Sequence, residues 1–426
     1  MSEENDSKEN KEDKYNKWEK QRMIRNQRPY QLMYSKTGNR PVSLAVALCA
    51  RICGRLGFLV GGLRRQEIKP QDSLEKTRKS LEELCPKPES DAPEWKPMAD
   101  LDPAVDLSVI VPAHNAEKYI ETCVDSILNQ KGDYRIQVIL VNDGSTDRTA
   151  EILENYRGLA NVGIIDLHEG GSASRARNEG LLHAVGRYLM FVDSDDKLRP
   201  HAVEALMRTA EQEDADVVQG GWQYMDEAGI YGNIQIYEEM RYTARHRADC
   251  LDLPGMPWGK VYKRELFEKI RFPSNYTCFE DTIIHFLVFR KAKTIVSIRE
   301  NVYLWRKNFS GITSTSQGRP SAVQGYWIVE EMLERDRILG LPHDQMFFES
   351  LTMQLSNYCY ANLRGLEEAG KQEVFQLCCA LYQKYQIECE KEIGKMAYAI
   401  RCGAKALQMN RYDLWCNQGR LFQLMN

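Results

Sequence analysis

Apolar, strand-like runs alternate with helix-like segments between residues 107 and 219, and this alternation constrains the fold more than any other feature of the sequence. Strands that alternate with helices form βαβ units, which favour a parallel sheet. We therefore expect an α/β domain with a mostly parallel sheet. The strands are predicted at 107–111, 136–141, 162–166, 188–192 and 216–219, and the helices at 116–130, 146–156, 173–185 and 200–213.

Three carboxylates follow the fourth predicted strand. Asp193, Asp195 and Asp196 come directly after the apolar run that ends at Val192. Ligands of open α/β sheets bind outside the carboxyl ends of the strands, and Mg²⁺ and Mn²⁺ prefer carboxylate and phosphate oxygens. The cluster indicates a site for Mg²⁺ or Mn²⁺ with nucleotide phosphates. A solvated acidic turn before the helix near Pro200 is the alternative.

Short motifs accompany the predicted strands in a fixed order. They are Val109–Asn115, Val141–Asp147, Ala176–Gly180, Asp193–Asp196 and Phe279–Thr282. Together they resemble the successive motifs of family-2 glycosyltransferases over roughly residues 106–315. The resemblance implies the GT-A fold, a nucleotide-diphospho-sugar transferase fold with a mixed, mostly parallel sheet flanked by helices. Two departures are His114 and Asn142, where the family often has Tyr and Asp.

The residues after the first two strands are candidates for nucleotide binding. The turn 112–115 leaves the first strand with one φ locked by proline, so its backbone groups can bond a planar base edge. Asp143 is placed to accept from a uracil N–H or a ribose hydroxyl, and capping the next helix is its alternative role, for which Ser145 or Thr146 is better suited. The candidates in this group are Pro112, Ala113, His114, Asn115, Glu117 and Asp143.

A second group of candidates surrounds the acidic cluster. Arg177 lies on the helix 173–185, where its guanidinium can pair with phosphate, and a surface salt bridge is the alternative. The neighbouring Asn178 is a further candidate. By the resemblance, Asp193 holds the ribose or the sugar and Asp195 coordinates the metal ion. Asp196 completes the cluster.

The second half of the predicted domain carries an acidic pair. Glu280 and Asp281 begin a helix predicted to run to about residue 290, and acids are common at helix starts because the dipole favours anions there. The resemblance implies instead that this pair faces the sugar and that Asp281 is the general base. His285 and Arg306 are expected near the same site.

Upstream of the acidic pair, Trp258 stands in a Trp-Gly-Lys turn that precedes a short helix in the segment Pro257–Phe267, which also resembles the family. Its indole could stack on a sugar face or belong to the core. The stretch 221–247 allows no secure assignment and is expected to cover the acceptor side.

Basic residues gather near the N-terminus, although the net charge of the chain is −4. The segment Val42–Leu63 is apolar but contains Arg51 and Arg55, which share one helical face. Each Arg near a helix centre costs roughly 2.5–3.5 kcal/mol on insertion, whereas each Leu or Val returns only about 0.3–0.6 kcal/mol. An amphipathic helix on an anionic membrane surface is therefore expected, and docking on the protein's own core is the alternative.

These patterns divide the chain into five parts. The twelve cysteines include no CxxC pair, which favours reduced thiols in a cytoplasmic protein. With the predicted membrane-surface helix, this protein is expected to be peripheral on the inner face of the cell membrane. No nucleic-acid partner is expected. The parts are 1–40, a disordered basic arm; 41–66, the membrane-surface helix; 67–105, a linker with a short charged helix at 71–84; 106–315, the GT-A domain; and 316–426, a C-terminal helical region.

The sequence predicts an inverting glycosyltransferase that moves a sugar from a nucleotide-diphosphate donor, UDP-linked, to the hydroxyl of a sugar or lipid-linked acceptor in cell-surface polysaccharide or glycolipid synthesis. Inversion rests on the resemblance. Two alternatives stay open. A nucleotidyltransferase of related fold would need a Gly-rich, Lys- or Arg-bearing loop where this chain has residues 112–115. A catalytically silent, membrane-associated scaffold would not need Asp195 and Asp281.

Overall fold

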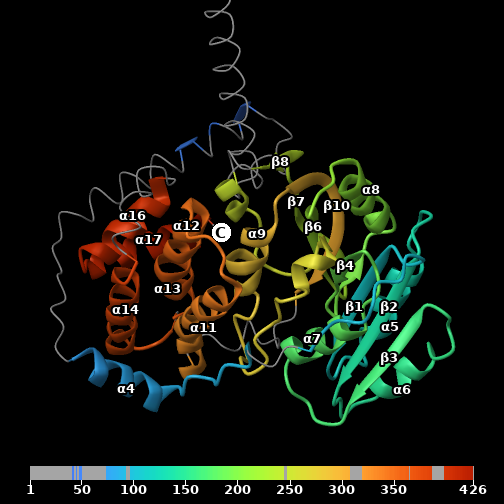
Figure 1. Cartoon of the computed structure of the whole chain (residues 1–426), viewed down its shortest axis with the longest axis horizontal. Helices are drawn as coiled ribbons and strands as arrows, with labels where there is room; N and C mark the ends of the chain where they lie inside the picture. The colour runs from blue at the N-terminus through green and yellow to red at the C-terminus, as the bar shows by residue number, and fades with distance from the viewer. Residues whose placement is uncertain are drawn as a thin grey trace, which may run out of the picture.

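The computed structural model describes residues 73–92, 96–243, 247–307, 319–363, 365–385 and 398–425, with five positions between residues 41 and 49. The basic arm at 1–40 and most of the helix predicted at 41–66 lie outside the described residues. In the part that is described, no helix has the length and apolar character needed to cross a membrane. Figure 1 shows a sheet with its helices in one half of the molecule and the C-terminal helices in the other.

One sheet joins the strands of the first half. Its strand order is β3-β2-β1-β4-β9-β6-β10-β5, with β7 beside β6 and β8 beside β10. The strands β3, β2, β1 and β4 pair in parallel, whereas β9 is antiparallel to β4 and β6, so the predicted mixed, mostly parallel sheet is confirmed. The strands are β1 Leu107–Ala113, β2 Ile136–Asp143, β3 Val162–Leu167, β4 Tyr188–Phe191, β5 Lys197–Leu198, β6 Val217–Asp226, β7 Gly229–Gln235, β8 Met240–Tyr242, β9 Lys260–Lys263 and β10 Ile295–Arg306.

The predicted helices lie between these strands. Every residue of β1 is buried, as expected for a strand covered on both faces. Helix α7 packs closely on it, because a Cβ on Gly180 would lie 2.4 Å from the Ile110 side chain. The observed helices are shorter than predicted by up to four residues at an end, and α7 begins at the predicted residue, Ala173. They are α5 Ile120–Leu128, α6 Thr149–Glu154, α7 Ala173–His183 and α8 Ala202–Gln212.

The stretch 221–247, which carried no assignment, extends β6 and adds two short strands. β6 and β7 form a hairpin whose turn is closed by Asp226, which accepts hydrogen bonds from the amides of Ala228 and Gly229. After a 3₁₀ turn, η2 Arg247–Asp252, the Trp-Gly-Lys turn leads into β9 and η3 Arg264–Phe267. The acidic pair then precedes η4 Ile284–Val288 and α9 Phe289–Lys291, as predicted.

The C-terminal region is helical, as predicted. Helix α4 Leu74–Leu84, the short charged helix of the predicted linker, lies against it in Figure 1, and Arg78 of α4 pairs with Glu330 of α11. The described linker residues from 96 onward also contact the catalytic domain, since the Ala99 amide donates to the Leu182 carbonyl oxygen of α7 and the Asp102 amide donates to the Val185 carbonyl oxygen. The helices are η5 Pro320–Val323, α11 Gln324–Leu339, α12 Gln345–Met353, η6 Gln354–Tyr358, α13 Cys359–Asn362, α14 Glu368–Gln383, α16 Tyr398–Gln408 and α17 Tyr412–Met425.

Candidate active site

The acidic cluster lies where β4 leaves the sheet, beside the end of β10. Asp196 is 1% exposed and accepts hydrogen bonds from the Tyr303 hydroxyl at 2.7 Å and the Arg306 amide at 2.6 Å. The Asp193 amide donates to the same Tyr303 oxygen at 3.1 Å. Burial, with Asp195 and Asp193 nearby, raises the pKa of Asp196 well above its ordinary value. Asp196 therefore fixes the turn to β10, and the solvated-turn alternative is wrong for this residue.

Arg177 joins the acidic cluster to the acidic pair. Its guanidinium comes from α7, and the residue is only 4% exposed. Nη2 lies 2.9 Å from Asp193 Oδ1, and Nη1 lies 3.1 Å from Glu280 Oε1 and 3.7 Å from Asp281 Oδ1. The predicted contact with phosphate and the alternative of a surface salt bridge both need correction, because the guanidinium is buried among protein carboxylates.

Asp281 has the environment of a base with a high proton affinity. The residue before the pair, Phe279, has a φ of +68°, a conformation that is rare for a bulky side chain and common at functional sites. The Asp281 side chain is 38% exposed, but its Oδ1 is buried and has no hydrogen-bond partner among the described residues. Burial of Oδ1, together with the charge of Glu280, raises the pKa of Asp281 to about 8 against the opposing effect of Arg177.

The turns after β1 and β2 are bonded to each other. His114 Nδ1 lies 2.8 Å from the Asp143 carbonyl oxygen, and Asn115, with a φ of +48°, accepts from the Thr146 amide at 2.8 Å. Glu117 accepts from the Arg148 amide at 3.0 Å and so also ties the two turns together.

Asp143, the predicted partner of the base or ribose, is 4% exposed, and its carboxylate accepts from the Gly171 amide at 3.2 and 3.1 Å. Asp143 does not cap α6, and neither does Ser145 or Thr146. Instead, the Asp147 carboxylate accepts a hydrogen bond from the Thr149 amide at the start of that helix.

Pro112 and Ala113 lie inside β1, paired with β2, and not in the turn that was predicted. The carbonyl oxygen of Ile110 accepts a hydrogen bond from the Val192 amide, just after β4. Because the backbone groups of alternate residues in a strand point to the same neighbouring strand, the nitrogen of Pro112 also lies on the β4 side. The pairing with β4 ends at Ile110, so the missing N–H of Pro112 interrupts no hydrogen bond. His114 and Asn115 are thus the exposed part of the predicted turn.

The remaining candidates take different positions. Arg306 lies at the acidic cluster, where Nε donates to the Asp195 carbonyl oxygen at 2.7 Å and the guanidinium lies 4.1 Å above the Tyr119 ring. Trp258 is 3% exposed and stacks on Tyr303 with ring centroids 4.5 Å apart, which matches the core alternative. Asn178 bonds through its amide group to Phe272 and Ser274.

His285 was expected near the site, and this expectation is wrong. The residue is 2% exposed, and Nε2 lies 2.7 Å from the Leu253 carbonyl oxygen. Burial lowers the pKa of His285 to about 4, so the imidazole is neutral and part of the core. The helix that follows the acidic pair turns this side chain inward.

Two site residues were not predicted from the sequence. Tyr303 bonds both the Asp193 amide and the Asp196 carboxylate. Lys260 has no exposed surface and bonds the carbonyl oxygens of Met256 and Trp258, and burial lowers its pKa to about 7 while Asp281 opposes the shift. Their signals were the Tyr-Leu-Trp-Arg and Trp-Gly-Lys motifs, whose aromatic and cationic side chains flank the carboxylates.

The acidic cluster fits a divalent metal ion only if phosphate supplies further ligands. No group of three His, Cys, Asp or Glu side chains in the described part of the chain has the geometry of a metal site. Asp193 is paired with Arg177, and both carboxylate oxygens of the buried Asp196 already accept hydrogen bonds, from Tyr303 and from the Arg306 amide, so Asp195 is the better candidate ligand. Mg²⁺ is commonly held by one or two carboxylates together with substrate phosphates, so this donor set is compatible with the ion.

Comparisons with known proteins agree with the observed fold. Residues 108–271 match the family model for Glycosyl transferase family 2. Glycosyltransferase GlyG of Streptococcus pneumoniae serotype 4 is 34% identical over 224 residues, 49% of this chain and 73% of GlyG. Glycosyltransferase GlyA of the same organism is 27% identical over 322 residues, 70% of this chain, so that the match spans only 44% of GlyA.

Among solved structures, S. aureus TarS 1–349 in complex with UDP-GlcNAc superposes with a TM-score of 0.58 at 21% identity, over 75% of this chain and 92% of that chain. This likeness concerns the fold, which is that of a GT-A glycosyltransferase. The family assignment rests on the sequence relatives, since the match to GlyG covers 73% of that protein at 34% identity. The chain described here belongs to glycosyltransferase family 2 and has the GT-A fold.

Proposed function

We propose that this protein is an inverting glycosyltransferase that moves a sugar from a UDP-sugar to the hydroxyl of a sugar or lipid-linked acceptor. The observation that carries the proposal is the position of Arg177, whose guanidinium pairs with Asp193 at the end of β4 and with Glu280 and Asp281 before η4. A sugar held by Asp193 would therefore lie close to a carboxylate that can act as base.

Asp281 would be the general base. In its ionised form, it takes the proton of the acceptor hydroxyl while the oxygen attacks the anomeric carbon. The new C–O bond forms on the face opposite the diphosphate, and the bond from the anomeric carbon to the diphosphate oxygen breaks, so UDP leaves with the electron pair. Arg177 holds the carboxylate in place, and its own charge is balanced by Asp193 and Glu280.

UDP is the proposed nucleotide because the two bonded turns after β1 and β2 offer hydrogen-bond acceptors for a uracil base and a ribose. Asp143 is nearly buried, and a carboxylate that is held by the Gly171 amide has lone pairs left for a uracil N–H or a ribose hydroxyl. His114 and Asn115 form the exposed edge beside it. The solved relative that binds UDP-GlcNAc supports this choice.

Asp195 would hold Mg²⁺ or Mn²⁺ together with the diphosphate. The ion supplies positive charge that stabilises the leaving UDP. Arg306 bonds the Asp195 carbonyl oxygen and so contributes a second positive charge at the same turn. A nucleotidyltransferase is not favoured, since the segment 112–115 has no glycine, lysine or arginine.

The acceptor would be part of a cell-surface polysaccharide or glycolipid. Ten basic residues and no acidic ones between Lys20 and Arg65 suit an anionic membrane surface, where each Lys or Arg is worth about 1 kcal/mol. A cytoplasmic enzyme that is peripheral on the inner face of the cell membrane would meet a lipid-linked acceptor there.

A donor panel tests the proposal. Purified full-length protein is incubated with UDP-, GDP-, dTDP- and CDP-linked sugars and with Mg²⁺ or Mn²⁺, and nucleotide release is measured. We expect UDP release from at least one UDP-sugar, with the sugar first appearing as the anomer opposite to that of the donor by NMR. Release from another nucleotide class alone would overturn the UDP assignment, and a product of retained configuration would overturn inversion.

A further inference from the structure

We propose that Asp91, in the segment before the catalytic domain, is a positioning residue for Asp281. The proposal rests on the proposed function, in which Asp281 is the base. Asp91 and its partner Arg335 of α11 hold the chain segment 271–276, which leads directly to the acidic pair. The predicted linker would thus contribute to the geometry of the active site.

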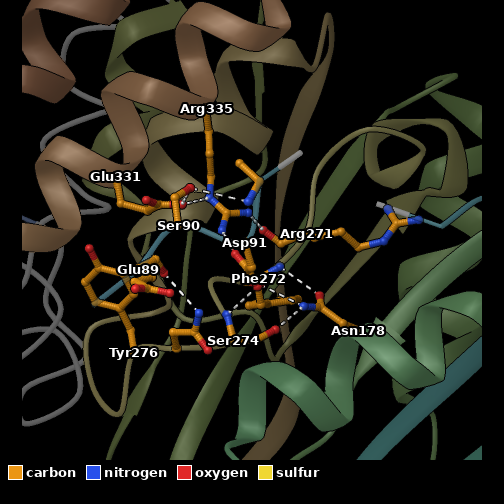
Figure 2. A network of polar contacts seen from close by, with 12 residues as sticks. Glu89, Ser90, Asp91, Asn178, Arg271, Phe272, Ser274, Tyr276, Glu331 and Arg335 are labelled. Carbon is orange, nitrogen blue, oxygen red and sulfur yellow. Dashed lines mark hydrogen bonds and ion pairs between the residues drawn. The ribbon is translucent and has the colours of Figure 1, made fainter. Parts of the chain in front are cut away.

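Ser274 is the point at which this segment is held. Its amide donates to Asp91 Oδ2 at 3.0 Å, and its hydroxyl oxygen accepts from the Asn178 side chain at 3.0 Å. Its carbonyl oxygen accepts from the Ser172 hydroxyl at 2.9 Å. Figure 2 shows Asp91 and Asn178 approaching the segment from different elements. The polar groups of Ser274 are therefore held by α7 and its N-cap on one side and by the predicted linker on the other.

Arg335 fixes the position of Asp91. It has no exposed surface, and it donates to Asp91, to the Glu331 carboxylate at 2.7 Å and to the Arg271 carbonyl oxygen at 3.0 Å. Ser90, beside Asp91, also donates to Glu331, at 2.9 Å. Arg335 and Glu331 are buried, and the Arg335 charge depends on its carboxylate partners for compensation, so the ion pair holds Asp91 although its side chain is 27% exposed (Figure 2).

The opposite side of the segment is continuous with the base. Asn178 bonds both the amide and the carbonyl oxygen of Phe272, and the Phe272 ring lies 5.2 Å below the guanidinium of Arg177. Arg177 in turn pairs with Asp281 and its neighbour Glu280. A shift of the segment would therefore displace Asp281 both through Arg177 and along the chain.

A second contact between the N-terminal segment and α11 allows a purely structural role to be tested separately. Arg78 of α4 pairs with Glu330 of α11 at 2.7 Å, and Lys87 pairs with the same carboxylate. These pairs also attach the N-terminal segment to α11, but Arg78 and Lys87 bond to the carboxylates of Glu82 and Glu330 and not to the segment 271–281. Arg78→Gln is therefore the matched control for the loss of one such attachment.

The test compares Asp91→Asn with Arg78→Gln in the full-length protein. Asparagine keeps an oxygen for the Ser274 amide but loses the charge that pairs with Arg335. With the UDP-sugar that the donor panel identifies, we expect Asp91→Asn to lower kcat roughly 10- to 100-fold, a typical loss for a displaced catalytic group. KM for the donor and the affinity for UDP should stay within about 2-fold, because Ser172 remains the N-cap of α7, where it accepts from the Arg175 amide, and the neighbouring Gly171 amide continues to hold Asp143.

Arg78→Gln should retain wild-type kcat at a similar melting temperature. Equal kcat values for the two variants would overturn the proposal, and so would a loss in Asp91→Asn that appears in KM alone. A lower melting temperature with unchanged kcat per folded molecule would also assign Asp91 a structural role only.

Hydrogen exchange separates this proposal from the proposed function. If the wild-type protein releases UDP from no donor, the proposed function is refuted. The exchange rate of the amides in residues 272–283 then still tests whether Asp91 positions this segment. Faster exchange in Asp91→Asn than in wild type and Arg78→Gln supports this role. Equal exchange in all three proteins overturns it.

Discussion

The pH dependence of turnover is the sharpest test of Asp281 as the base. Its pKa is raised to about 8, first by burial and then by Glu280. A base works in its ionised form, so a raised pKa means that activity increases as the pH rises through 8. At pH 7 only about one molecule in ten would carry the ionised base, and kcat should therefore rise roughly 5- to 10-fold between pH 7 and pH 9.

The charged groups near Asp281 determine how this value can be changed. Glu280 raises the pKa, whereas Arg177 and the buried Lys260 lower it and Asp193 raises it. Removing the charge of the neighbour in Glu280→Gln should therefore move the rising limb of the profile to lower pH. Because Glu280 and Asp281 interact, the measured value belongs to the pair.

The assay is the initial rate of UDP release from a saturating UDP-sugar between pH 6 and pH 9.5. Asp281→Asn should lower kcat by roughly 10² to 10⁴ and remove the rising limb, with donor affinity nearly unchanged. His114→Gln, a substitution in the nucleotide turns and not in the acidic pair, is the control and should keep the limb. A flat wild-type profile, or a limb that persists in Asp281→Asn, would refute the assignment of Asp281 as the base.

Further predictions concern the metal ion, the core and the membrane. Asp195→Asn should abolish metal-dependent UDP binding by calorimetry while leaving the melting temperature unchanged, and wild-type binding would exclude Asp195 as a ligand. Trp258→Ala should destabilise the protein by about 3–5 kcal/mol in urea unfolding, because its buried indole stacks on Tyr303, and a change in activity alone would favour a sugar contact. Deletion of residues 1–65 should abolish cosedimentation with phosphatidylglycerol vesicles but keep donor hydrolysis, and equal pelleting of both proteins would leave the docked-helix alternative.

The arrangement of the sheet could be predicted where the chain signals it locally. Buried parallel strands are continuously apolar and alternate with helices, so β1, β2 and β4 and the helices between them follow from the sequence, and the partly exposed edge strand β3 follows from the same alternation. The strands from β6 to β10 lack this continuous apolar pattern. They mix aromatic and polar residues, and β10 pairs with the distant strands β5, β6 and β8, so nothing local in the sequence identifies its partners.

The candidate site shows the same division between local and distant information. The motifs correctly placed Asp193 and Asp195 at the end of β4 and Asp281 before a helix. The role of Arg177 could not be predicted, because a guanidinium on a helix can meet phosphate or carboxylate, and only the folded chain shows which of them surrounds it. The prediction for His285 was wrong for a related reason. The spacing between His285 and Asp281 in the sequence does not reveal which side of the following helix faces the core.

The predicted linker shows why composition can mislead about mobility. Proline and acidic residues at 86–103 are typical of solvated connections, yet Asp91 in this stretch contacts the buried Arg335. A buried guanidinium needs carboxylates around it, and Arg335 draws them from α11 and from the segment before the catalytic domain. The charge requirement of one residue in the C-terminal region therefore fixes a distant acidic segment, and that segment bonds the stretch of chain that leads to Asp281.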